Sequence, residues 1–249
     1  YPTLSDLNSD SLISPFGARR SHGTMGSVAA MISTEPDFRY IRASAGKGDT
    51  KSFFMSTLFT VLNGEQGVSF VGPYMGSPYA AMLLESLIAK GSDKIVVLGW
   101  CGAISESVKT GDIIVVESAV SDEGTSRNYI DSKEEFPSLL PSEGLTRDLV
   151  EELEKQELSF KKGKIWTTDA IYRETAKKIA FFREKGAVAV EMECSALFSV
   201  AKYRKKDVAA LLVVSDEVSS LNWKPGFRNK RFKEARKRAA NVIMEFCKY

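Results

Sequence analysis

The sequence is poor in histidine and cysteine, and this restricts the chemistry open to it. A single histidine, His22, is present among 249 residues, which excludes a histidine-rich metal site and argues against a Ser-His-Asp triad. The three cysteines, Cys101, Cys194 and Cys247, are widely spaced in apolar segments. Such an odd, scattered set is typical of reduced core thiols and indicates a cytoplasmic protein. Acid–base chemistry is therefore expected from carboxylates, tyrosine, lysine or arginine.

Long apolar runs and a strong charge excess are also missing. No apolar stretch approaches the roughly 20 residues that a membrane-spanning helix needs. Residues 1–26 lack the apolar centre of a signal peptide, and their Ser, Asp, Pro and Gly content predicts an extended N-terminal arm. The net charge of +2 gives no reason to expect a nucleic acid or a membrane as partner. Residues 27–249 are long enough to form one α/β domain with a sizeable core.

The most informative stretch that is present covers residues 187–218. It predicts a strand at residues 187–190, an acidic turn with Glu191 and Glu193, a helix, and a second strand that ends just before Asp216. Ligand sites of open α/β sheets lie beyond the carboxyl ends of strands, and carboxylates there lose solvation unless something binds them. The pattern predicts an acidic site. A helix cap or a solvated loop acid remains the alternative, above all for Glu191.

Short apolar runs and turn residues alternate through the rest of the domain, as in α/β proteins. Asn63-Gly64 between two apolar runs predicts a hairpin. Strands are predicted at residues 28–33, 52–62, 67–71, 94–98 and 113–116, and helices at residues 79–90, 145–157 and 232–247.

The run Val190-Glu191-Met192-Glu193, followed by a small-residue helix and then Val214-Ser215-Asp216, resembles the nucleoside phosphorylase/nucleosidase family of the uridine and hexameric purine phosphorylase type. The resemblance extends from about Ser27 to the C-terminus. It implies a single-domain three-layer αβα fold around a mixed, largely parallel, twisted sheet. It also implies cleavage of the N-glycosidic bond of a nucleoside, as in purine salvage, with no cofactor, inorganic phosphate as a possible co-substrate, and a homo-oligomer, either a dimer or a hexamer.

The resemblance also assigns roles to the acidic stretch. Asp216 would protonate the leaving base, and Arg228 would position it. Glu193 would accept hydrogen bonds from the ribose hydroxyls beside Glu191, while Met192 packs on the sugar. The glycosidic bond breaks through an oxocarbenium-like transition state, which such groups can stabilise.

A second family signature is matched only in part. Gly99, Cys101 and Gly102 agree with it, but Val97 stands where the phosphate-binding arginine is expected. Trp100 stands where a phosphate-binding hydroxyl is expected. Neither side chain can bind a dianion, which requires cationic donors and hydrogen bonds.

The base-binding segment also departs from the uridine type. Tyr172 fits the family pattern loosely, and Ile171 replaces an aromatic that stacks on the base. The Gln and Arg that contact a pyrimidine are not evident in the continuation Arg173-Glu174-Thr175. This favours a purine nucleoside. Tyr172 could equally be a packing aromatic.

The identity of the nucleophile stays open at the level of sequence. Arg39 or Arg127 could replace the missing phosphate ligands, although Arg127 could simply be solvated. Family membership favours phosphorolysis to ribose 1-phosphate. If water is the nucleophile instead, Glu35 is a candidate base and the protein is a nucleosidase. An inactive nucleoside-binding member is a third possibility, and His22 could reach a neighbouring subunit's site or be an ordinary surface histidine.

Overall fold

The computed structural model describes residues 7, 9, 11–15, 26–63 and 66–248. Most of the predicted N-terminal arm, including His22, lies outside these residues. The strands are β1 (Val28–Ile32), β2 (Asp49–Phe53), β3 (Ser56–Asn63), β4 (Gln66–Gly72), β5 (Lys94–Ala103), β6 (Ile113–Asp122), β7 (Ser138–Leu139), β8 (Lys161–Thr168), β9 (Ala187–Glu191), β10 (Asp207–Glu217) and β11 (Lys224–Pro225). The helices are α1 (Glu35–Ser44), α2 (Ser77–Ala89), α3 (Glu143–Lys155), α4 (Ala176–Glu184), α5 (Cys194–Arg204) and α6 (Lys230–Phe246), with 3₁₀ turns η1 (Ser126–Asn128) and η2 (Ile171–Arg173).

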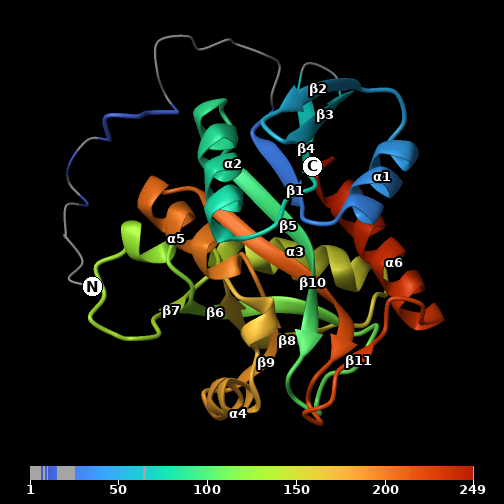
Figure 1. The fold of residues 1–249 in the computed structure, drawn as a ribbon. Helices are drawn as coiled ribbons and strands as arrows, with labels where there is room; N and C mark the ends of the chain where they lie inside the picture. The colour runs from blue at the N-terminus through green and yellow to red at the C-terminus, as the bar shows by residue number, and fades with distance from the viewer. Residues whose placement is uncertain (1–6, 8, 10, 16–25, 64–65, 249) are drawn as a thin grey trace.

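One mixed sheet connects all the strands, in the order β11-β10-β6-β8-β9-β5-β1-β4-β3-β2, with β7 on β6. Strand β5 also pairs with β10, in parallel, along most of its length. Because β5 pairs with β9 as well, strands β5, β9, β8, β6 and β10 close into a ring. The carboxyl ends of β5 and β10 lie side by side at the lower end of the molecule in Figure 1.

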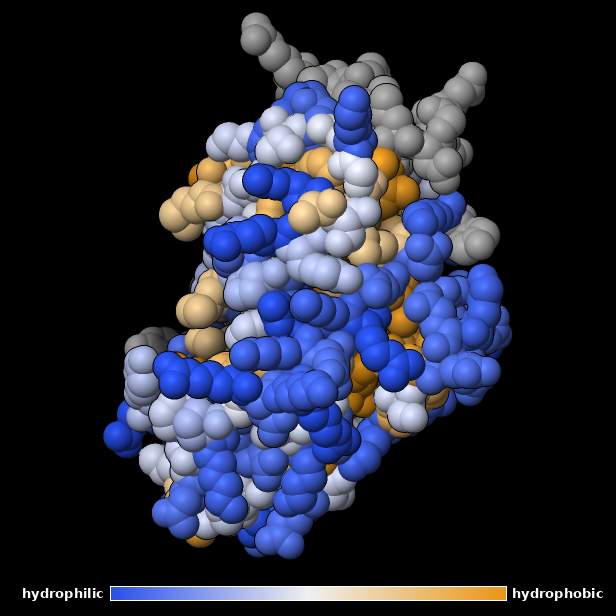
Figure 2. Space-filling model, turned by 90° about the vertical axis from the view of Figure 1, so that its right-hand side faces the viewer, coloured by the Kyte–Doolittle hydropathy of each residue, from blue (hydrophilic) through white to orange (hydrophobic). Residues whose placement is uncertain are grey.

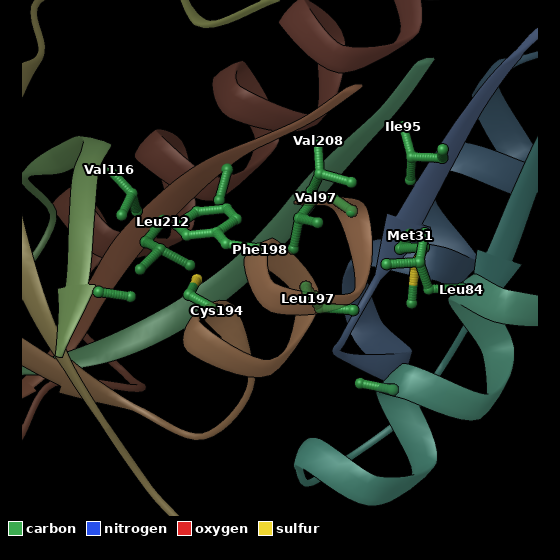
Figure 3. Packing of buried hydrophobic residues seen from close by; sticks show 14 of the residues in the cluster. Met31, Leu84, Ile95, Val97, Val116, Cys194, Leu197, Phe198, Val208 and Leu212 are labelled. Carbon is green, nitrogen blue, oxygen red and sulfur yellow. The ribbon is translucent and has the colours of Figure 1, made fainter. Parts of the chain in front are cut away.

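Helices cover both faces of the sheet, which makes three layers (Figure 1). On one face α2 and α5 pack over a cluster that includes Met31, Leu84, Val97 and Phe198 (Figure 3). On the other face α1, α3 and α6 pack over a second cluster. Helices α1, α3 and α6 present apolar residues at helical spacing on one side, so burying that side drives the packing. The first two turns of α5 are buried on all sides. Burial of a side chain such as Phe198 contributes about 1.5–3 kcal/mol.

Several predicted boundaries are corrected by the structure. The single strand predicted at residues 52–62 is interrupted at Phe54, whose positive φ of 56° turns the chain between β2 and β3. Residues 34–37, whose proline favours a turn after the first strand, instead begin α1, with Pro36 in its first turn, where the missing N–H of proline has no helical partner to lose. Strands β5 and β10 both continue beyond their apolar runs, to Ala103 and Glu217.

The surface over α1 and α6 is predominantly hydrophilic, with hydrophobic residues visible only in places (Figure 2). This agrees with the many Lys and Arg residues on the outer side of α6. Across the described residues, the helices lack the combination of length and apolar character that crossing a membrane requires.

Candidate active site

A cavity of about 500 Å³ lies where β5, β9 and β10 end. It brings together nine residues that the sequence singled out: Trp100, Cys101, Gly102, Ile171, Tyr172, Glu191, Met192, Glu193 and Asp216. The described residues that line it include four acids, the three just named and Glu174, and no lysine, arginine or histidine. The described lining therefore carries a net negative charge when these carboxyl groups are ionised.

Gly102 of β5 fixes the spacing between the two acidic segments. It pairs with Val190 of β9 on one side and with Asp216 of β10 on the other. A Cβ atom at this position would lie 3.3 Å from Asp216 Oδ2 and 3.5 Å from Val190 Cγ1. The absence of a side chain therefore lets the Asp216 carboxyl approach the β5 backbone.

Glu191 acts as the cap of α5. Its Oε2 atom accepts hydrogen bonds from the backbone N–H groups of Glu193 (2.7 Å) and Cys194 (2.8 Å), and its other oxygen accepts one from the Thr167 hydroxyl. These are the N–H groups that a helix start leaves without intrahelical partners. Burial raises the pKa of Glu191 and these hydrogen bonds oppose the rise. With its oxygens occupied, this carboxyl organises the turn rather than facing a ligand.

Glu193 retains capacity for a ligand. Its Oε1 atom accepts a hydrogen bond from the Gly76 N–H at 2.6 Å, and the Met192 backbone N–H also donates to the carboxyl group. Burial, followed by the nearby negative charge of Glu191, raises the pKa of Glu193 to about 8. Beside it, Tyr74 lines the same cavity with a buried hydroxyl that has no partner in the described part of the chain. This hydroxyl is therefore available to donate to a ligand in the cavity.

Asp216 is oriented by two hydrogen bonds. Trp223 Nε1–H donates to its Oδ2 atom at 2.8 Å, and the Ser215 hydroxyl donates to its Oδ1 atom at 2.6 Å. Trp223 and Phe227 also line the cavity, so the segment after β10 forms part of its wall. The structure thus pairs Asp216 with an indole rather than with the arginine expected from the sequence.

Trp100 fills the region where the resemblance expects a phosphate-binding hydroxyl. Its Nε1–H donates to Asp37 Oδ2 at 2.6 Å, and its ring packs edge-on against Phe232 with 4.9 Å between centroids. Asp37 is only 1% exposed and also forms an ion pair with Arg236. Burial raises the pKa of Asp37, while the positive charge of Arg236 opposes the rise. The indole is therefore anchored from behind by a buried ion pair.

Four residues assigned to the site from sequence lie elsewhere. Glu35 and Arg39 form an exposed ion pair on α1 at 2.7 Å. Arg127 donates to the Glu135 carbonyl at 2.7 Å on an exposed loop. Arg228 is exposed, and neither it nor the other three lines the cavity. These positions were inferred from sequence order, which does not show on which side of a helix or loop a side chain falls.

Three residues of the site escaped the sequence assignment. Asp37 carries no motif signal, because the partners that bury it, Trp100 and Arg236, are remote in sequence. Tyr74 lies between Gly72 and Gly76 and carries no signal of its own. Glu174 lines the cavity after η2, and burial, followed by the negative charge of Asp216, raises its pKa to about 7. Its only signal was its position two residues after Tyr172.

The remaining cavity residues have passive roles. Tyr172 is 96% exposed and sits with Ile171 on η2 at the rim. Burial raises the pKa of the Cys101 thiol well above its usual value, so the sulfur stays protonated and is not a nucleophile. Among the described residues, no group of three or more His, Cys, Asp or Glu side chains is arranged to hold a metal ion.

Fold and cavity together define an α/β protein with an acid-lined pocket at the carboxyl ends of its strands. A model of the phosphorylase superfamily matches residues 23–248, and the chain belongs to that superfamily. The DeoD-type purine nucleoside phosphorylase of Brevibacillus brevis is 34% identical over 158 residues, which cover 61% of this chain and 64% of the relative. Guanosine phosphorylase of Halorubrum lacusprofundi is 29% identical over 150 residues, covering 60% and 61%. The chain thus spans less than two thirds of the length of these relatives.

Solved structures show the same fold over nearly the whole chain. Uridine phosphorylase of Vibrio fischeri superposes with a TM-score of 0.79 at 22% identity, covering 90% of this chain and 93% of that one. Purine nucleoside phosphorylase of Toxoplasma gondii, in complex with immucillin-H, gives 0.81 at 16%, covering 93% of both. The 5′-methylthioadenosine/S-adenosyl homocysteine nucleosidase of Campylobacter jejuni gives 0.77 at 17%, covering 91% and 99%. The fold predicted from sequence is therefore confirmed.

Proposed function

We propose that this protein cleaves the N-glycosidic bond of a purine nucleoside. The observation that carries the proposal is the convergence of Glu193 and Asp216 on one cavity, from strands that share Gly102 as pairing partner. The reaction needs a proton donor for the departing base and an anionic group near the sugar. The two carboxyl groups supply both, and the names of the relatives support the same substrate class.

Asp216 protonates a ring nitrogen of the base as the bond breaks. A positioned acid of this kind contributes roughly 10²–10⁴-fold to the rate. Trp223, rather than the predicted Arg228, holds the carboxyl group in this structure through its indole N–H. Trp223 lies on the cavity wall, so it also excludes water from the proton donor when a base is bound.

Glu193 binds the sugar through its carboxylate, whose lone pairs outnumber the two backbone N–H groups that hold it and so can also accept from the ribose hydroxyls. The Gly76 N–H fixes Oε1, and Ser77 donates to the Met192 carbonyl at 2.7 Å, which fixes the turn. The unpartnered Tyr74 hydroxyl is a donor for the same hydroxyl groups. Once ionised, as pH rises through its pKa of about 8, Glu193 also places a negative charge close to the forming oxocarbenium ion. Such a charge is most effective in a site that excludes water.

Water is the nucleophile that this cavity favours. Its described lining has no cationic side chain, and the Trp100 indole fills the region expected to bind phosphate. A phosphate dianion there would be desolvated among carboxylates, which is strongly unfavourable. The hydroxyl of Thr34 lines the cavity and donates to Asp37 at 2.9 Å, so its lone pairs remain available to hold a water molecule. The products would be free base and ribose.

Phosphorolysis is the second candidate, favoured by the relatives named as phosphorylases. It requires cationic groups that the described lining of one subunit does not provide. A neighbouring copy in a homo-oligomer, as the family resemblance implies, would have to supply them. In that case the Trp100 indole must also move.

Release of purine base from inosine and adenosine, with and without inorganic phosphate, tests the proposal. Hydrolysis predicts equal rates in both buffers and ribose as the sugar product. An absolute phosphate requirement with ribose 1-phosphate as product would establish phosphorolysis instead. Nucleoside binding without release of base would identify an inactive binding member.

A further inference from the structure

Glu174 is a carboxyl group inside the cavity that the reaction described above does not use. It follows η2, is half-buried, and lines the cavity together with Asp216. Within the described residues its carboxyl group has neither a hydrogen bond nor an ion pair. Carboxyl groups that lose solvation without gaining a partner destabilise the folded state. The position therefore suggests a partner that arrives with the substrate.

The electrostatic environment indicates which end of the cavity Glu174 faces. The pKa of Glu174, about 7, is raised by burial and then by Asp216, whereas the pKa of Glu193 is raised by burial and then by Glu191. Glu174 therefore lies nearer the proton donor for the base than the group that binds the sugar. On a purine, ring nitrogen N7 and the substituent on C6 share one edge. A base whose N7 faces Asp216 consequently presents its C6 substituent on the same side.

We propose that Glu174 determines base specificity by contacting the substituent on purine C6; this rests on the proposed function. An ionised carboxylate accepts a hydrogen bond from a 6-amino group, as acidic side chains do from exocyclic amines of nucleic acid bases. The same carboxylate repels a 6-oxo group. Once protonated it can donate to that oxygen. With Glu174 ionised, the protein thus prefers 6-amino purine nucleosides. With Glu174 protonated, it also accepts 6-oxo purine nucleosides.

This preference makes the choice of substrate depend on pH near neutrality. The titratable groups that share the cavity with Glu174 are Asp216, at the same end, and Glu191 and Glu193, at the sugar end. On its own segment, Tyr172 and Arg173 are exposed. Ionisation of Glu193 alters the turnover of both substrate types, because both share the ribose. The ratio of the two rates therefore isolates Glu174.

The test compares kcat/KM for adenosine and inosine at pH 6 and pH 8.5. In the unmodified protein we expect the adenosine-to-inosine ratio to rise by roughly tenfold between these pH values, the size of one lost hydrogen bond to a charged group. Glu174→Gln should remove this pH dependence, because an amide both donates and accepts at every pH. Glu184→Gln, an exposed acid on α4, is the matched control and should behave as the unmodified protein. An unchanged pH dependence of the ratio in Glu174→Gln would overturn the assignment.

Binding of the free bases separates this inference from the proposed function. Adenine and hypoxanthine affinities are measured calorimetrically at both pH values for the same three proteins. If no nucleoside is cleaved but the adenine-to-hypoxanthine affinity ratio depends on Glu174 and pH, the specificity role holds and the proposed activity fails. If nucleosides are cleaved with a ratio that Glu174→Gln leaves unchanged, the activity holds and the specificity role fails. Absence of both cleavage and base binding would overturn both.

Discussion

At the scale of single residues, the two functional acids of the cavity, Asp216 and Glu193, differ in the groups that hydrogen-bond to them. Asp216 is oriented by Trp223 and Ser215, and Glu193 is held by two backbone N–H groups. A carboxyl that protonates a leaving group and one that binds hydroxyls need different environments. Two predictions concern these side chains directly.

Asp216→Asn should reduce the rate of base release by roughly 10²–10⁴-fold, because the amide has no acidic proton to transfer. The amide still accepts from the Trp223 indole, so the fold should persist. Steady-state rates and far-UV circular dichroism measure the two effects. The neighbouring Glu217→Gln is the control, since Glu217 binds Thr110 and does not line the cavity. A near-normal rate for Asp216→Asn would remove Asp216 from the mechanism.

Glu193→Gln should make the protein more stable at alkaline pH while it loses activity. The folded-state pKa of about 8 lies above the ordinary glutamate value of 4.5, so the folded state holds a proton that the unfolded state releases between these values. The stability that Glu193 contributes is complete below the unfolded pKa and is lost as pH rises through the folded pKa. The variant has no such group. Its Tm advantage over the unmodified protein should therefore grow between pH 4.5 and pH 8.

A scan of Tm against pH checks the Glu193 prediction. Glu106→Gln is a suitable comparison, because Glu106 is exposed on the loop after β5 and should change the curve little. A Tm difference for Glu193→Gln that stays constant from pH 4.5 to pH 8 would contradict the raised pKa.

At the scale of elements, the site depends on strands that run past their apolar segments. Strand β5 continues through Trp100 to Ala103, and β10 continues through Asp216 to Glu217. The paired extension of β10 therefore carries the proton donor Asp216, whereas Glu193 lies on the turn between β9 and α5. Regular structure of this kind holds functional groups more tightly than a loop does.

Gly102→Ala should lower activity more than it lowers stability. The new Cβ would meet Asp216 Oδ2 at 3.3 Å, and a displacement of the proton donor well below 1 Å is enough to slow turnover by roughly tenfold. Rates and Tm are measured together. In Gly124→Ala the nearest atom lies at 3.9 Å, so this control should retain its rate. A fully active Gly102→Ala protein would show that the Asp216 position is not set by contact with β5.

The sequence predicted the elements better than their ends. Apolar runs located most of the longer strands and helices but not α1, α4 or β8, and the acidic turn before α5 located the site. The closure of β5 onto β10 could not be inferred, because pairing between distant strands leaves no local pattern. The roles assigned to Glu35, Arg39 and Arg127 assumed that conserved order implies a conserved side-chain direction. The buried Asp37 was missed because its partners, Trp100 and Arg236, are remote in sequence.

At the scale of the whole molecule, an exposed apolar surface lies beside the cavity mouth. Ser56 donates to the Pro73 carbonyl at 2.6 Å, which joins the β2–β3 turn to the loop before α2. Around this junction Phe54, Met55 and Met75 are 55%, 84% and 76% exposed. Clusters of exposed large apolar side chains mark interaction sites. We therefore expect the homo-oligomer that the family resemblance implies to form through this surface.

Met55→Lys should shift the protein toward the monomer, because a lysine in a packed apolar contact must lose its hydration. Light scattering coupled to size exclusion, over a range of protein concentrations, measures the mass. Leu140→Lys is the control, as Leu140 is also exposed and follows β7 on the opposite side of the molecule (Figure 1). An unchanged mass for Met55→Lys, or an equal shift for Leu140→Lys, would exclude this surface as the contact.

The closed ring of β5, β9, β8, β6 and β10 carries the residues that break the bond, whereas Glu174 lies outside it. Asp216 and the turn that bears Glu193 belong to ring strands or their immediate ends, whereas Glu174 sits on the excursion between β8 and α4. Exchanging residues 169–175 would leave the bond-breaking apparatus untouched while altering which bases are admitted. The base specificity of this fold can thus change through one short surface segment, while the bond-breaking reaction stays the same.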